Sequence, residues 1–93
     1  MGLIRLYATL RSRAGGESVV ELPWSDGDTI ADVLRELLRR KPDLDGCILD
    51  GEGQTLRHVG VFLDGRDIRH LDGLESRVAE ETEIAIFPPV AGG

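Results

Sequence analysis

The sequence contains few of the residues from which disulfides and metal sites are built. It has one cysteine, Cys47, and two separated histidines, His58 and His70. A single thiol cannot form an internal disulfide and fits a reducing compartment, and these residues lack metal-ligand spacing. We therefore expect no metal site, a buried or half-buried structural Cys47, and histidines at the surface or a strand edge rather than acting as general bases.

Basic residues and long apolar runs are also scarce. Eleven Lys and Arg residues stand against 17 Asp and Glu residues, giving a net charge of −6, and Lys41 is the only lysine. This balance argues against a nucleic-acid surface, and no run reaches the roughly 18–20 apolar residues of a membrane span. Arg5 comes too early for a signal peptide. We expect one soluble cytoplasmic domain with no nucleic-acid or membrane partner.

Apolar patterning predicts strands on both sides of one helix. Residues 3–8 are almost continuously apolar, and residues 18–22 follow a turn at 14–16, so we expect a hairpin. Thr29 precedes Asp32 by three residues, which predicts a helix cap. The helix then continues to Pro42, with apolar residues along one stripe: Ile30, Val33, Leu34, Leu37 and Leu38.

The second half predicts a loop followed by three more strands. Residues 43–56 lack a long periodic pattern and are interpreted as a variable loop. Residues 58–64 and 66–68 flank the hairpin signal Asp64-Gly65, residues 71–74 suit a short helical turn or bend, and residues 83–87 form the last strand. This order predicts an α+β, ubiquitin-like β-grasp fold, with about five strands in a mixed sheet and the first and last strands parallel at its centre.

Strand alternation predicts two different sheet faces. The helix-facing set comprises Ile4, Leu6, Val59, Val61, Leu63, Ile84 and Ile86. The opposite set comprises Leu3, Tyr7, Gly60, Phe62, Ala85 and Phe87. An apolar patch on an uncovered face suggests partner docking, although cover by loop 43–56 or a homodimer is an alternative. Trp24 is assigned to the core.

The end of the chain carries no charged side chain. Pro88 and Pro89 favour an extended exit from the last strand, and Val90, Ala91, Gly92 and Gly93 follow. Four extended residues reach at most about 13 Å, enough to place a terminal carboxylate in a narrow pocket. A frayed terminus is the alternative interpretation of these glycines. We predict a β-grasp domain over 1–89 and a flexible tail over 90–93.

Several segments resemble the ubiquitin-like sulfur carriers of the MoaD/ThiS family, of the molybdopterin synthase small-subunit or cysteine-biosynthesis type. The resemblance lies in strand one, the helix start at residues 28–34, and residues 57–93, including the tail 84–93, while 41–56 is unmatched. Many relatives have an acidic-Gly-Asp turn before the last strand, where this chain has Glu80-Glu81-Thr82. Without glycine, a left-handed residue there costs about 1 kcal/mol or more.

The resemblance implies a carrier rather than an enzyme. An adenylating, E1-like activating enzyme would use ATP to activate the Gly93 carboxylate, and a sulfur donor would convert it to a thiocarboxylate for an acceptor biosynthetic enzyme. No cofactor would be bound and no side chain would be catalytic, although the protein could be the small subunit of a synthase complex. Two alternatives stay open: a protein modifier conjugated through Gly93, and a plain β-grasp interaction module.

Overall fold

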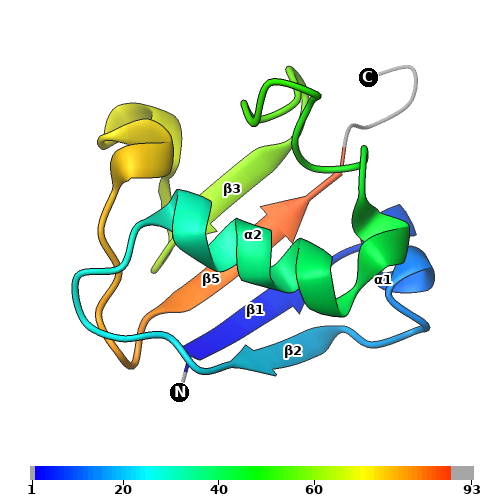
Figure 1. Cartoon of the computed structure of the whole chain (residues 1–93), viewed down its shortest axis with the longest axis horizontal. Helices are drawn as coiled ribbons and strands as arrows, with labels where there is room; N and C mark the ends of the chain where they lie inside the picture. Colours follow the sequence, from blue (N-terminus) through cyan, green and yellow to red (C-terminus); the bar gives the residue numbers. More distant parts are fainter. Residues whose placement is uncertain (1, 89–93) are drawn as a thin grey trace.

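Two layers, a mixed β-sheet and one long helix, make up the fold (Figure 1). The computed structural model describes residues 2–88. The strands are β1 Gly2–Leu6, β2 Val19–Leu22, β3 Gly60–Leu63, β4 Arg66–Asp67 and β5 Glu83–Phe87. The helices are α1 Thr9–Arg13, α2 Ile30–Arg40, and the short 3-10 turns η1 Pro42–Leu44, η2 Ile68–His70 and η3 Gly73–Glu75.

The strand order confirms the predicted β-grasp. The sheet runs β2-β1-β5-β3-β4, with β1 and β5 paired in parallel at the centre and antiparallel neighbours on either side. A parallel pair needs a long crossover, and the chain between β1 and β5 supplies it by passing through α2. Helix α2 crosses one face of the sheet, and none of the helices within residues 2–88 covers the other face (Figure 1).

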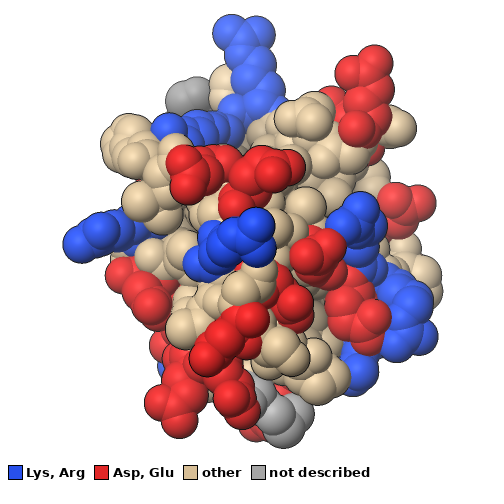
Figure 2. All heavy atoms as spheres, turned by 60° about the vertical axis from the view of Figure 1, so that its left-hand side comes forward, with Lys and Arg blue, Asp and Glu red and all other residues tan. Residues whose placement is uncertain are grey.

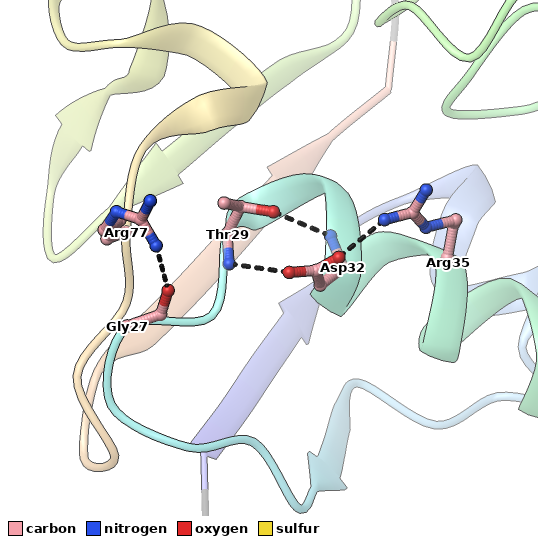
Figure 3. Close-up of polar contacts among 5 residues, drawn as sticks. All are labelled: Gly27, Thr29, Asp32, Arg35 and Arg77. Atoms are coloured by element: carbon pink, nitrogen blue, oxygen red, sulfur yellow. Dashed lines mark hydrogen bonds and ion pairs between the residues drawn. The ribbon is translucent and has the colours of Figure 1, made fainter.

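Helix α2 begins at the predicted cap. The Thr29 hydroxyl accepts from the Asp32 amide at 3.2 Å, and the Asp32 carboxylate accepts from the Thr29 amide at 3.1 Å (Figure 3). The hydrogen bond from the Thr29 amide, then the Thr29 side chain and the bond from Arg35 at 2.5 Å, lower the pKa of the Asp32 carboxyl. Arg77 donates to the Gly27 carbonyl at 2.6 Å, which ties the segment before α2 to the segment that leads into β5.

The helix-facing side of the sheet forms the core. Six of the seven predicted residues, Ile4, Leu6, Val59, Val61, Ile84 and Ile86, are at most 1% exposed, whereas Leu63 is half-buried. Trp24 is buried, as predicted, and its indole N–H donates to the Ala79 carbonyl at 2.8 Å. Its ring covers Gly2, where an added Cβ would lie only 1.7 Å from a ring carbon. Glycine at position 2 therefore makes room for the tryptophan.

The first two strands are antiparallel, but the predicted simple hairpin between them is wrong. Strand β1 ends at Leu6 instead of residue 8, and the unpredicted helix α1 fills most of the connection. Leu10, on α1, is 2% exposed and joins the core. The predicted turn at 14–16 is present, and both of its glycines, Gly15 and Gly16, have positive φ. Ala8 caps α1 at φ 52°, a value that L-residues rarely adopt.

The segment 43–56 is more than a variable loop. It begins within η1, contains a bridge between Leu49 and Thr55, and gives Leu44, Ile48 and Leu49 to the core. Cys47 is half-buried beside them, as predicted. Because three of its side chains are buried, this segment is an integral part of the domain.

Two turns position the last strands. Asp64 and Gly65 both have positive φ, at 49° and 85°, which confirms the predicted two-residue hairpin turn. Strand β3 is shorter than the predicted 58–64, and β4 ends at Asp67 because Ile68 enters η2. Residues 73–75 form the 3-10 turn η3, which overlaps the helical turn or bend expected at 71–74.

The turn before β5 avoids the strain that its lack of glycine suggests. Within residues 2–88, only Ala8 and Asp64 are non-glycine residues with positive φ. The turn is closed by the Thr82 hydroxyl, which accepts from the Ala79 amide at 2.8 Å, and by the Thr82 amide, which donates to the Ala79 carbonyl at 3.0 Å. Glu80-Glu81-Thr82 thus turns the chain without a left-handed residue.

Candidate docking face and C-terminal tail

Strand β5 carries the chain to the predicted tail. It ends at Phe87, and Pro88 is the last described residue. The predicted tail residues, Val90, Ala91, Gly92 and Gly93, lie outside the described residues, as does the proposed boundary at residue 89. What the structure does show is the surface from which the tail starts.

An aromatic patch, formed by Tyr7, Phe62 and Phe87, lies on the sheet face opposite α2. The Tyr7 and Phe87 rings stack with centroids 4.4 Å apart, and Phe62 meets Phe87 edge-on at 5.4 Å. Tyr7 and Phe87 are each 39% exposed, so the segment 43–56 does not cover them. The strand-alternation prediction therefore places these three side chains correctly. The other two predicted docking residues, Leu3 and Ala85, are half-buried. Ala85 pairs with Phe62, whereas Leu3 pairs with Glu83, two residues before Ala85.

Gly60 contributes to the patch because it has no side chain. A Cβ at this position would lie 3.1 Å from the Phe62 ring and 3.9 Å from the Phe87 Cβ. Gly60 also pairs with Phe87 across the β3–β5 ladder. The bare backbone of Gly60 therefore leaves room for the Phe62 ring, which meets Phe87 edge-on.

The same face carries an ion pair that the sequence prediction left out. Arg5 donates its Nε hydrogen to the Glu83 carboxylate, and both side chains are partly exposed. Strand alternation could have predicted that both residues lie on this face, because Arg5 and Glu83 have the same strand parity as Leu3 and Ala85. The face is thus an aromatic patch at the tail end of the sheet, bordered by a paired charge.

The described residues contain no arrangement typical of a catalytic centre. No group of three or more potential metal ligands is found among residues 2–88, and His58 and His70 are exposed, as predicted. Glu36, on α2, is the carboxylate whose pKa is lowered most: hydrogen bonds from Arg39 and then Arg40 lower it to about 2. These are exposed ion pairs along one helix, which explains the shift without a catalytic role.

Charge is unevenly spread over the surface. On the face in Figure 2, which turns the left-hand side of Figure 1 forward, acidic side chains are spread over much of the surface and gather at its lower left, and basic side chains lie among and above them. This fits the net charge of −6 and gives no continuous basic stripe on this face. No helix within residues 2–88 has the length and apolar character needed to cross a membrane.

Comparison with models of protein families shows to which family the chain belongs. The model of the ThiS family matches residues 4–93, a span that includes the whole sheet from Ile4 and the C-terminal glycines. The chain belongs to the ThiS family. It is 36% identical over 92 residues to small archaeal modifier protein 3 of Haloferax volcanii, covering 97% of this chain and 96% of that protein.

Two further comparisons support the same fold and size. The sulfur carrier protein CysO of Mycobacterium tuberculosis is 29% identical over 92 residues, covering 97% of this chain and 96% of that protein. A solved chain of the Amycolatopsis orientalis BexX/CysO complex superposes with a TM-score of 0.85 at 27% identity, covering 100% of both chains. The chain is thus a small β-grasp protein of the sulfur carrier and ubiquitin-like modifier group.

Proposed function

We propose that this protein carries sulfur as a thiocarboxylate on Gly93. An adenylating enzyme joins the Gly93 carboxylate to AMP from ATP and releases pyrophosphate. A sulfur nucleophile then displaces AMP and leaves a C-terminal thiocarboxylate for an acceptor enzyme in biosynthesis, such as that of molybdopterin or cysteine. Because a carboxylate is a poor electrophile, adenylation supplies the leaving group that the substitution needs.

One observation carries the proposal: the ThiS-family match covers the β-grasp sheet and extends through Gly92-Gly93. The protein's own side chains then supply binding, and the catalytic groups belong to the partners in the cytoplasm. The proposal is supported by the solved BexX/CysO complex, in which a similar chain occurs together with another protein.

We assign the docking of the activating or acceptor enzyme to the aromatic patch. Phe87 is the last residue of β5, so the tail begins at the edge of this patch. An enzyme that holds the Gly93 carboxylate, six residues or at most about 20 Å of extended chain from Phe87, also comes close to Tyr7, Phe62 and Phe87. Aromatic side chains at the centre of an interface are frequent binding hot spots.

A second function is favoured by the similarity to small archaeal modifier protein 3. The same activated Gly93, attacked by a lysine of a target protein, would form an isopeptide bond. Mass spectrometry of the protein purified from its own cells distinguishes the two functions. Replacement of one carboxyl oxygen by sulfur supports the carrier, high-mass adducts support the modifier, and an unmodified terminus in every preparation contradicts both.

The tail is tested separately with the cognate activating enzyme. Deletion of Gly93 is expected to abolish ATP–pyrophosphate exchange while the melting temperature stays the same, because the residue lies beyond the last strand. Gly92→Val is expected to block thiocarboxylate formation, since β-branched bulk fits poorly in a narrow channel. Undiminished exchange after the deletion would contradict the proposed function.

A further inference from the structure

Tyr7 lies beside the residue from which the tail starts. Strands β1 and β5 run parallel side by side (Figure 1), and their last pair is Leu6 with Ile86, so Tyr7 and Phe87 follow next to each other. Their rings stack with centroids 4.4 Å apart and planes 10° apart. Phe62, on the strand that flanks β5 on its other side, meets Phe87 edge-on. The Phe87 side chain is therefore held between rings from both neighbouring strands.

The backbone on either side holds Tyr7 in this place. Before it, Leu6 is buried and its amide donates to the Ser18 carbonyl at 2.8 Å. After it, the amide of the buried Leu10 donates to the Tyr7 carbonyl at 3.1 Å. Between these anchors Ala8 has φ 52° and ψ −123°, outside the regions that residues other than glycine normally occupy. Such strain persists only where the surroundings over-determine the conformation, so Tyr7 has little freedom to leave the stack.

The stack bears on the direction in which the chain leaves the sheet. Phe87 precedes Pro88, and a residue before proline is restricted to extended backbone. Two successive prolines, Pro88 and Pro89, favour an extended course of about 3.1 Å per residue. A change in the orientation of Phe87 is therefore carried outward. Over the six residues to Gly93, at most about 20 Å, a rotation of about 20° moves the end of an extended chain by roughly 7 Å.

We propose that Tyr7 is a positioning residue for the Gly93 carboxylate and acts through its stack on Phe87. This rests on the proposed sulfur-carrier function and adds to it, because Tyr7 then directs the tail as well as contacting the enzyme. With the exit direction fixed, the carboxylate samples a smaller volume, so its effective concentration at the active site of a docked activating enzyme is higher. The stack needs the ring of Tyr7 and not its hydroxyl.

The first test uses the free protein, so that contacts with an enzyme play no part. In the full chain labelled with ¹⁵N, the heteronuclear NOE of the Val90 and Ala91 amides measures their order on the picosecond to nanosecond scale. Tyr7→Ala is expected to lower both values, because the ring that holds Phe87 is lost. Tyr7→Phe keeps the ring and is expected to keep both values at the wild-type level.

The second test separates positioning from docking with the cognate activating enzyme. Tyr7→Ala is made in the natural chain and in a chain that carries both Pro88→Gly and Pro89→Gly. The glycine chain keeps the length of the tail and Gly93, but its flexible backbone no longer transmits a direction. Tyr7→Ala is expected to lower kcat/KM for ATP–pyrophosphate exchange at least about fivefold more in the natural chain, because the lost docking contacts are the same in both.

Leu71→Ala is the matched control, since Leu71 is 37% exposed, close to Tyr7 at 39%, but belongs to no part of the patch. It is expected to leave the NOE values and the exchange rate unchanged. Equal NOE values in the wild type and Tyr7→Ala, or equal losses of kcat/KM in the proline and glycine chains, would overturn the proposal. Absence of exchange with the wild type would contradict the sulfur-carrier function instead, and the NOE comparison would still decide whether Tyr7 directs the tail.

Discussion

Replacing Phe62 tests whether the aromatic patch is a docking surface. In Phe62→Asp the ring that meets Phe87 at 5.4 Å is lost, and a carboxylate is placed next to Asp67, the cross-strand partner of position 62. Phe62→Ala removes the ring without adding charge. The two variants together separate the loss of apolar contact from charge repulsion.

The structure sets the expected magnitudes. An edge-on aromatic pair contributes about 0.5–1.5 kcal/mol, and Phe62 is half-buried over Gly60, so Phe62→Ala should lower the free energy of unfolding by about 1–2 kcal/mol. Phe62→Asp should lower it somewhat further, because like charges opposite each other on two strands repel. Loss of a central aromatic anchor should weaken enzyme binding by about 2–4 kcal/mol, or roughly 30- to 900-fold in Kd.

The assay compares urea unfolding with calorimetric affinity for the cognate activating or acceptor enzyme, at a temperature where every variant is folded. Leu71→Asp is the matched control, since Leu71 is 37% exposed, close to Phe87 at 39%, but belongs to no part of the patch. If Phe62→Ala binds as tightly as the wild type, or if Leu71→Asp weakens binding equally, the patch does not direct docking.

Three further predictions concern the domain itself. Gly2→Ala should cost about 2 kcal/mol of stability and change the emission of Trp24, the only tryptophan, because the new Cβ would lie 1.7 Å from its ring; unchanged urea unfolding and fluorescence would contradict the close packing. Ala8→Gly should raise stability by about 1 kcal/mol, since φ is 52° there, and a lower melting temperature would contradict the strain. Glu36 should titrate near pH 2 by carbon NMR, and Arg39→Gln should raise that midpoint. Because folding lowers this pKa from 4.5, the stabilising contribution is complete above 4.5 and is lost as the pH falls through about 2.

Patterns with a local physical cause were predictable from the sequence. The cap of α2 depends on Thr29 and Asp32, three residues apart, and the β3–β4 turn depends on Asp64-Gly65, so both were placed correctly. Strand alternation placed Tyr7, Phe62 and Phe87 together although they are far apart in the chain. The parity of a strand fixes its faces once the fold class is known.

Features that depend on tertiary packing were not predictable in the same way. Helix α1 has only five residues, too few for a periodic signal, and it exists because Leu10 is buried in the core. The segment 43–56 showed no period because Leu44 enters the core from the three-residue turn η1 and Ile48 from a bend after it. Gly2 carried no visible signal either, since the residue that requires it, Trp24, lies 22 positions away.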